Sequence, residues 1–219
     1  LSTASFKVFV PSVTGTIFAP KIFILSTFGF SFAISISSVS AMASATNLIA
    51  GSYARTLGYY AVNDGGGAIY KITDQVDLSA HQENLGDGLY ATLIIDSNTD
   101  IRQFGVSESN ADNATQLQEA VNKCNVLNGF EGEINVGANI TIAHTDFVYD
   151  FKKLTVKCTA SLGQFITIES PDTTRVTGEL KNLIIDSNAK AQTGLAIYDG
   201  KRLNITNLLL KGATVTELD

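Results

Sequence analysis

The feature that most constrains the fold is a series of short apolar segments with brief connections in the second half of the chain. After Gly132 these segments occupy residues 134–136, 140–142, 154–156, 165–168, 183–185, 195–197, 205 with 208–210, and 214–216. Their length and their Gly, Asn and Asp boundaries are typical of strands. A parallel strand pair joined by a helix needs a dozen or more connecting residues, so an α/β fold is excluded. Hairpins or a coiled solenoid remain.

A repeat of 25 residues favours the solenoid. Asn182-Leu183-Ile184-Ile185 and Asn207-Leu208-Leu209-Leu210 show the same pattern at that spacing. Periods in the twenties are typical of stacked repeats, in which each turn buries its apolar positions against its neighbours. The stack would place Asn182 under Asn207, where the two amides can hydrogen-bond along a ladder. The prediction of a solenoid rests on this single pair of repeated segments.

The region before the repeats predicts a small β-rich head. Residues 53–60, 68–72 and 89–95 have strand-like patterns, and Asn-Asp-Gly-Gly-Gly at residues 63–67 separates the first two. Glycines adopt positive φ without steric cost, so this run predicts a hairpin turn. A glycine-rich phosphate loop is the alternative, but it needs a following helix, and a strand pattern follows instead.

One amphipathic helix is predicted over residues 115–126. Leu117, Ala120, Val121 and Cys124 recur there at helical spacing, Asp112-Asn113 supplies a cap, and Asn128-Gly129 ends it. Cys124 lies on the apolar stripe with no histidine near it in sequence. We interpret it as a core side chain and not as a nucleophile.

Composition removes several function classes. The two cysteines, Cys124 and Cys158, and the two histidines, His81 and His144, are too few for a zinc cluster or a disulfide scaffold, so no metal or cofactor is expected. Acidic residues outnumber basic ones by 21 to 15, and no basic block occurs. Nucleic acid is therefore not an expected partner, because phosphate neutralisation needs clustered Lys and Arg.

The first 41 residues differ from the rest because they hold seven of the 12 phenylalanines and only two charges. Lys21, the apolar run 22–36 and two A-x-A patterns ending at Ala43 and Ala45 resemble a secretory signal. The alternative is strands or an N-terminal extension that does not belong to the main fold. The run is shorter than the about 20 residues that span a bilayer, so stable membrane insertion is not expected.

Three segments carry a resemblance to a known family. Residues 57–70 contain the glycine-rich turn, residues 100–106 read Asp-Ile-Arg-Gln-Phe-Gly-Val, and residues 112–121 begin the predicted helix. In this order and spacing they resemble phage and prophage tailspike-type proteins of the pectate lyase superfamily. The resemblance implies an all-β fold, a right-handed parallel β-helix with one N-terminal capping α-helix, preceded by a small β-rich head. It also implies a homotrimer.

The sequence departs from that family's pattern in the acidic loop. The family's G-D-G-x-x-D-D is here Ser-Glu-Ser-Asn-Ala-Asp-Asn at residues 107–113, with an amide, Asn113, in place of one acid. The chain also stops after the first few predicted coils, so we expect a fragment or a truncated product. The predicted division is an apolar leader (1–41), a β-rich head with the hairpin (42–99), and the capping helix with the first coils (100–219).

Candidate site residues come from the predicted coils, because glycan cleavage needs paired carboxylates or a base beside a uronate. Asp186 and Asp199 are the catalytic candidates. Tyr198 and Arg202, beside a predicted turn, and Lys211, one period after Asp186, are candidates for substrate binding. The simpler interpretation is a solvated turn and a surface ion pair between Asp186 and Lys211.

Three functions follow from these predictions. The leading hypothesis is the N-terminal part of a tailspike or tail-fibre-like protein of a virion, which recognises bacterial surface polysaccharide and cleaves it, if at all, only in full-length form. The first alternative is a secreted polysaccharide lyase or glycoside hydrolase of the same superfamily. The second is a non-catalytic structural adaptor of a virion or surface assembly.

Overall fold

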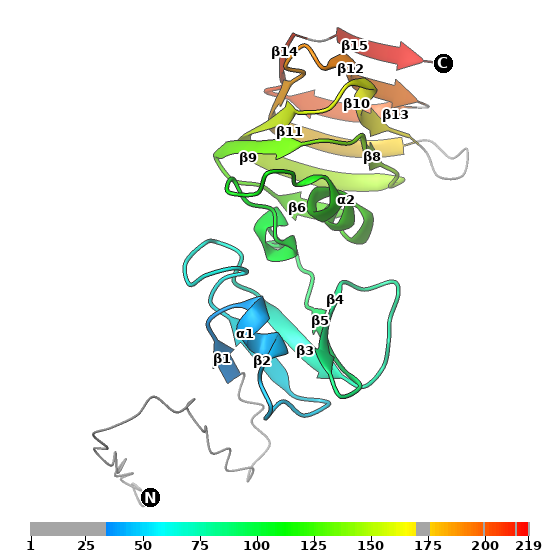
Figure 1. Cartoon of the computed structure of the whole chain (residues 1–219). Coiled ribbons are helices and arrows are strands. Elements are labelled where there is room, and N and C mark those ends of the chain that lie inside the picture. Colours follow the sequence, from blue (N-terminus) through cyan, green and yellow to red (C-terminus); the bar gives the residue numbers. More distant parts are fainter. Residues whose placement is uncertain (1–33, 170–175, 199, 213, 219) are drawn as a thin grey trace, which may run out of the picture. The chain divides into compact units, whose positions relative to one another are not determined.

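The computed structural model describes residues 34–169, 176–198, 200–212 and 214–218, which form a small mixed sheet followed by a parallel β-helix (Figure 1). The strands and helices follow the predicted order, so the all-β prediction and the choice of a solenoid over hairpins in the second half are confirmed.

The head is a five-stranded sheet with the order β1-β2-β3-β5-β4. Its elements are β1 (Ile34–Ile36), α1 (Val39–Ala43), β2 (Tyr53–Thr56), β3 (Ile69–Thr73), β4 (Gln82–Gly86) and β5 (Leu89–Leu93). β1 runs parallel to β2, and the other neighbours are antiparallel. Alternate residues such as Tyr70 and Ile72 are fully buried on one face.

Strand β1 and helix α1 belong to the head sheet and its core. Ile34, Val39 and Met42 are buried, and the backbone N–H of Val39 donates to the Tyr59 carbonyl at 3.0 Å. Part of the predicted leader, residues 34–41, thus packs with the head, whereas residues 1–33 lie outside the described residues. Cleavage at either A-x-A pattern would remove β1 and α1 from this core.

The predicted hairpin is present, but its first strand ends at Thr56 and not at residue 60. The reason is the Asp64 carboxylate, which accepts backbone N–H bonds from Tyr59, Tyr60, Ala61 and Gly66 at 2.7 to 3.0 Å. These bonds fold residues 57–67 into a compact loop, in which the amides of Tyr59, Tyr60 and Ala61 are not available to a strand.

Two glycines of this loop are required for different reasons. Gly65 has a φ of 85°, and a Cβ there would lie 2.1 Å from Arg102 Nη1. At Gly66 a Cβ would lie 2.5 Å from the Arg102 carbonyl oxygen. The loop therefore packs directly on the start of the β-helix, which only glycine permits.

The β-helix begins with the 3₁₀ helix η1 (Ile101–Phe104) and helix α2 (Ala114–Lys123). Its strands are β6 (Val126–Asn128), β7 (Gly132–Val136), β8 (Ile140–Ile142), β9 (Asp146–Cys158), β10 (Leu162–Ile168), β11 (Val176–Asp186), β12 (Ala191–Tyr198), β13 (Gly200–Thr206), β14 (Leu209–Lys211) and β15 (Thr214–Leu218). All pair in parallel. They form three faces. One face consists of β8, β10, β12 and β15. The first halves of β9 and β11 form a second face with β6 and β13, and the second halves of β9 and β11 form the third face with β7 and β14.

The predicted asparagine ladder is present at the bend between two of these faces. Asn207 donates its amide to Asn182 Oδ1 at 2.8 Å, and Asn182 donates to Asp150 Oδ1 at 2.8 Å. Both asparagines have a φ of 55°, in the left-handed region that Asn tolerates well. The coil length varies, because 133 pairs with 155, 155 with 184, and 184 with 209.

Side chains from the preceding segments close the first edge of the β-helix. Gln118 of α2 accepts from the Thr141 N–H at 2.8 Å and donates to the Thr141 carbonyl at 2.9 Å, as a neighbouring strand would. Glu108 accepts from the backbone N–H of Glu133 in β7, and Asp112 accepts from that of Gly137, just after β7. An edge covered in this way presents fewer unpaired groups to other chains.

The departure in the acidic loop has a structural reason. Asn113 is fully buried, accepts from the Ser107 N–H, and donates its amide to the carbonyls of Ser107 and Asn135. An ionised aspartate could not donate these bonds. Because its side-chain amide is engaged, Asn113 occupies the N-cap position of α2 without a capping side-chain bond, and the Asp112 carboxylate accepts from the Ala114 N–H at 2.9 Å.

The predicted end of the helix is wrong. Helix α2 ends at Lys123, and Val126, the last residue of the predicted helix, is instead the first residue of strand β6, which pairs with β9. Strand pairing overrides helical periodicity here. Cys124 is buried as predicted, and burial raises the pKa of its thiol to about 12, so it stays protonated at neutral pH. No helix in the described ranges is long and apolar enough to cross a membrane.

Candidate functional site

The predicted site residues lie at two different bends of the β-helix. Asp186 ends β11 and Lys211 ends β14, and the two are register partners on adjacent coils, as the 25-residue spacing predicts. No ion pair joins these two described side chains; Asp186 instead accepts from the Asn188 N–H at 2.9 Å. Lys157, the register partner of Asp186 on the other side, pairs with Glu133 at 3.2 Å.

Tyr198 and Arg202 lie at the next bend, beyond the whole length of β12. The Tyr198 hydroxyl accepts from the Gln164 side-chain amide of the adjacent coil, and Arg202 is exposed near the start of β13. Asp199 lies outside the described residues. The structure therefore does not bring Asp186 together with Tyr198 and Arg202, and the roles predicted for these residues stay predictions.

The two histidines contact helix α2. His144 Nε2 lies 2.6 Å from the Val121 carbonyl oxygen. His81, with a side chain only 12% exposed, lies 3.4 Å from both Glu83 and Glu119 and packs against Phe104 with the two rings tilted. Glu83 also accepts from the Tyr59 hydroxyl at 3.1 Å. This polar cluster joins the head to α2.

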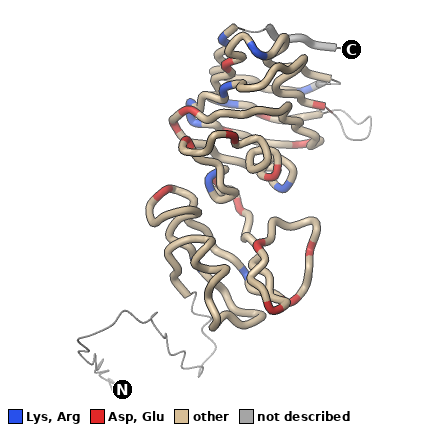
Figure 2. The backbone as a smooth tube through the Cα atoms, viewed as in Figure 1, with Lys and Arg blue, Asp and Glu red and all other residues tan. Residues whose placement is uncertain are grey.

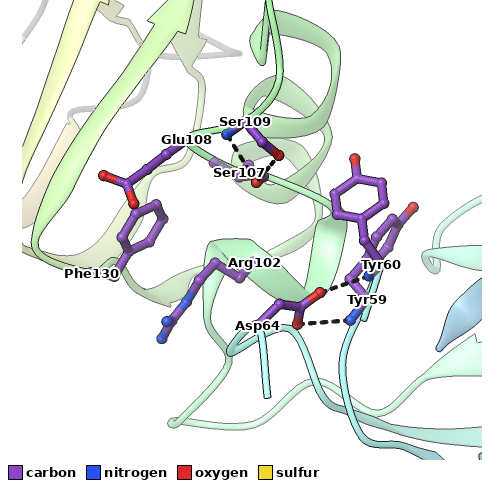
Figure 3. Close-up of a pocket in the computed structure, with 9 residues that line it drawn as sticks. Tyr59, Tyr60, Asp64, Arg102, Ser107, Glu108, Ser109 and Phe130 are labelled. Atoms are coloured by element: carbon purple, nitrogen blue, oxygen red, sulfur yellow. Dashed lines mark hydrogen bonds between the residues drawn. The ribbon is translucent and has the colours of Figure 1, made fainter. Parts of the chain in front are cut away.

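A pocket of about 250 Å³ lies where the glycine-rich loop of the head meets the start of the β-helix. Figure 3 shows Tyr59 and Tyr60 on one side, Phe130 and Glu108 on the other, and Asp64 and Arg102 between them. The complete lining is Tyr59, Tyr60, Asp64, Arg102, Val106, Ser107, Glu108, Ser109 and Phe130.

Two charged residues of the pocket are fixed by the fold. Asp64 uses both oxygens for the loop amides, and these bonds hold the pKa of its carboxyl below the usual value despite partial burial. Arg102 pairs with Asp100 through Nε and Nη2, both at 2.9 Å, and lies over the Phe130 ring at 4.9 Å. The pKa of Arg102 is raised, mainly by its side-chain hydrogen bond to Asp100.

Other polar groups of the lining can still form hydrogen bonds with a ligand. Among the described residues, Arg102 Nη1 and Glu108 Oε2 make no hydrogen bond, whereas Glu108 Oε1 accepts from the Glu133 N–H at 3.1 Å. The hydroxyls of Ser107 and Ser109 lie 2.8 Å apart. The pocket thus presents donors and acceptors beside aromatic side chains, the arrangement found in many small-molecule sites.

Only part of the signal for this pocket is present in the sequence. Its residues come from the glycine-rich turn, the Asp-Ile-Arg-Gln-Phe-Gly segment and the acidic loop, all of which stand out in the sequence. Their meeting point is not visible there, because Tyr60 and Asn110, joined at 3.2 Å, are 50 residues apart. Within the described residues, His, Cys, Asp and Glu form no group of three that could hold a metal ion.

Charges of both signs are scattered over the β-helix, and Figure 2 shows Lys and Arg as well as Asp and Glu along its coils. The head has few charges, and Arg55 is its only charged residue between residues 34 and 63. The described surface therefore has a mixed and overall acidic character, which agrees with the chain's net charge of −6.

Solved parallel β-helix proteins resemble this chain. WceF of Pantoea stewartii, described as a glycan biofilm modifying enzyme with a bacteriophage tailspike-like fold, matches with a TM-score of 0.64 and 14% identity over 86% of this chain and 32% of its own. The tailspike protein of an Acinetobacter phage matches with a TM-score of 0.52 and 13% identity over 84% and 39%. Tailspike protein 2 of an Escherichia coli O157:H7 bacteriophage gives 0.50 and 13% over 84% and 31%.

These similarities establish a tailspike-like parallel β-helix fold. The chain spans about a third of the length of these structures. No protein-family model and no curated protein matches the sequence.

Proposed function

We propose that this chain forms the head and first coils of a tailspike-like protein that recognises bacterial surface polysaccharide. The observation that carries the proposal is the joint arrangement of head, capping helix and coils. A single solved structure with a tailspike-like fold matches across 86% of the chain, so the likeness is not restricted to one β-helical segment.

The chemistry of the coil surface suits a carbohydrate. Tyr198 offers an aromatic side chain, and Arg202 and Lys211 are exposed donors on described coils. Sugars stack on aromatic side chains and bind through hydrogen bonds to charged and amide groups. We assign Tyr198, Arg202 and Lys211 to glycan contact, and Asp186 and Asp199 to any cleavage by a longer form.

Binding to a panel of purified capsular and O-antigen polysaccharides tests the proposal. We expect the full chain to bind one or a few of them, with weaker binding after Tyr198→Ala. Val126→Ala, which truncates a partly exposed side chain on the first coil, serves as the control. Absence of binding to every polysaccharide of a panel drawn from the host's own surface contradicts the proposal.

Assays for new reducing ends and for unsaturated uronates on the same panel address cleavage. We expect the 219-residue chain to be silent, because the proposed cleavage belongs to the longer form. Light scattering addresses assembly, for which we propose a homotrimer in a virion tail; a monomer at micromolar concentration contradicts that part.

The secreted-enzyme alternative is disfavoured by the head core. Cleavage after Ala43 or Ala45 would remove the buried side chains of Ile34, Val39 and Met42. Mass spectrometry of the mature N-terminus tests the secreted-enzyme alternative. A chain that begins at residue 44 or 46 would support secretion.

The adaptor function has one observation in its favour. Ile69 and Ile94 lie side by side on the outer face of the head sheet, 48% and 42% exposed, and a backbone bond of 2.9 Å joins them. Exposed apolar groups of this kind occur at protein contacts. Silence on the glycan panel, combined with head-dependent association with a virion or surface protein, would favour the adaptor.

A further inference from the structure

We propose that the pocket between the glycine-rich loop and the β-helix is a binding site for one neutral sugar residue of the glycan. This inference rests on the proposed function. It adds a second contact point, separate from the coil bends that carry Tyr198 and Arg202.

The size of the pocket fits a single ring. Its volume of about 250 Å³ is below the about 300–1,000 Å³ of sites for drug-sized ligands. The head contributes Tyr59 and Tyr60, and the β-helix contributes Phe130 (Figure 3). Tyr60 is 50% exposed, so its ring is available to the apolar face of a sugar.

The framework of the pocket is fixed before any ligand enters. Tyr60 donates its hydroxyl to the Gly105 carbonyl at 2.8 Å, and the Tyr59 hydroxyl donates to Glu83. Asp100 and Phe130 together hold the Arg102 guanidinium. A ligand therefore binds without a large cost for ordering these side chains.

The polar capacity left in the pocket matches sugar hydroxyls, each of which both donates and accepts. Arg102 Nη1 can donate to a ring hydroxyl, and Glu108 Oε2 can accept from one. Ser107 and Ser109 share one contact of 2.8 Å, and since each hydroxyl carries one proton, one proton remains for a ligand.

The charges of the lining favour a neutral sugar over a uronate. Asp64 and Glu108 contribute two carboxylates, whereas the one cation, Arg102, is already paired with Asp100. A carboxylate on the ligand would meet this excess of negative charge, and like charges at close range repel.

Titrations of the full chain with a methyl hexoside, a methyl N-acetylhexosaminide and a methyl hexuronide test the site by NMR. We expect millimolar binding of a neutral glycoside, with shifts at Tyr60 and Phe130, and weaker binding of the uronide.

Three variants localise the binding. Glu108→Gln keeps an oxygen that can accept from the Glu133 N–H but removes the charge, and we expect affinity to fall about five- to tenfold. Ser109→Trp, at an exposed position, fills the pocket and should abolish binding. Glu131→Gln makes the same charge change at an exposed residue outside the lining and should have no effect.

The outcomes separate this inference from the proposed function. Polysaccharide binding by the chain without any glycoside response overturns the sugar site alone, as does glycoside binding that Ser109→Trp leaves intact. A preference for the uronide overturns the charge argument. Glycoside binding at the pocket without polysaccharide binding overturns the proposed function, but the assignment of the pocket as a sugar site still stands.

Discussion

The head and the β-helix are both built of strands, but they are stabilised differently. The head has a mostly antiparallel sheet with several large apolar side chains exposed around it, including Ile49 at 66% and Leu78 at 87%. The β-helix buries its inward residues in stacked rows, where Phe147, Phe165 and Leu183 are at most 1% exposed.

In addition to its buried core, the head has polar contacts that fix its loop and its junction with the β-helix. Asp64 organises its loop, and the Gln103 side chain donates to the Gly67 carbonyl at 3.0 Å across the junction. Lys123 of α2 donates to the Leu78 carbonyl at 2.6 Å. We therefore expect core truncation to have the largest effect in the β-helix, and loss of charge or of a hydrogen bond to have the largest effect in the head.

The largest expected effect is that of Phe147→Ala in β9. The ring is buried, packs on Tyr149 at 4.8 Å, and fills the space above Gly178, where a Cβ would lie 2.7 Å from it. Its removal should lower the free energy of unfolding by about 3–5 kcal/mol, measured by chemical denaturation. Val148→Ala, on the opposite face and 38% exposed, should cost less than about 1 kcal/mol. Equal losses would contradict the stacked-core description.

The asparagine ladder gives the second prediction. Asn182→Ala removes bonds to Asp150 and Asn207 and places alanine, which tolerates the left-handed region less well than asparagine, at a φ of 55°, so we expect a loss of about 2–3 kcal/mol. Asn182→Gly removes the same bonds but tolerates the backbone, and should lose about half as much. If the two variants unfold at the same denaturant concentration, backbone conformation contributes nothing at this bend.

In the head, Asp64→Ala should cost about 1–2 kcal/mol, less than its four bonds suggest because the carboxylate is exposed. Hydrogen exchange should show faster exchange at the amides of Tyr59 and Tyr60, with the amides of β10 and β12 unchanged. Asp74→Ala, at another exposed turn of the head, is the control. Uniform acceleration across both regions would mean that they unfold as one unit.

The smallest expected effect is a pH dependence at the junction. The side-chain hydrogen bond with His81 is the main reason that the pKa of Glu83 lies below its usual value. The Tyr59 hydroxyl, which donates to the same carboxylate, lowers this pKa further. A lowered folded pKa means that the stabilisation is complete above the unfolded value of about 4.3 and is lost as pH falls through the folded one.

Thermal unfolding between pH 3 and 7 measures this effect. His81→Gln should flatten the acid side of the profile by an amount on the order of 1 kcal/mol. Glu119 on α2 places a second carboxylate beside His81, whereas burial raises the pKa of the nearby Tyr70 hydroxyl and keeps it neutral over this range. His144→Gln, which faces the Val121 carbonyl, should leave the slope unchanged; the same flattening in both variants would exclude the specific role of His81.

Much of the fold could be predicted because its signals are local or periodic. The Asn182 and Asn207 repeat indicated the stacking and the ladder, and the glycine-rich run indicated the hairpin. The end of helix α2 was predicted wrongly because Val126 pairs with Val148 in a strand. The end of β2 was predicted wrongly because the Asp64 carboxylate accepts hydrogen bonds from the amides of Tyr59 and Tyr60. Both errors arise where a contact distant in sequence, or a side chain, overrides local pattern.

The candidate site was harder to predict than the fold. The sequence identified Asp186 and Lys211 as stacked neighbours, and the register agrees. The separate strand patterns at 183–185 and 195–197 placed Tyr198 and Arg202 at a later turn than Asp186, but how far apart the two bends lie depends on how three faces close around the coil. The pocket was not predicted at all.

The sequence by itself determined the strand-rich composition, the stacking of at least two coils, the hairpin and the capping helix. These follow from side-chain periodicity and from backbone preferences of Gly and Asn, which act within a few residues or at a fixed period. Only the tertiary structure decided the register of the unequal coils, the closure of the first edge by Glu108, Asp112 and Gln118, and the pocket at Arg102. Those features depend on contacts between residues 20 to 50 positions apart, whose geometry is set by packing and not by local pattern.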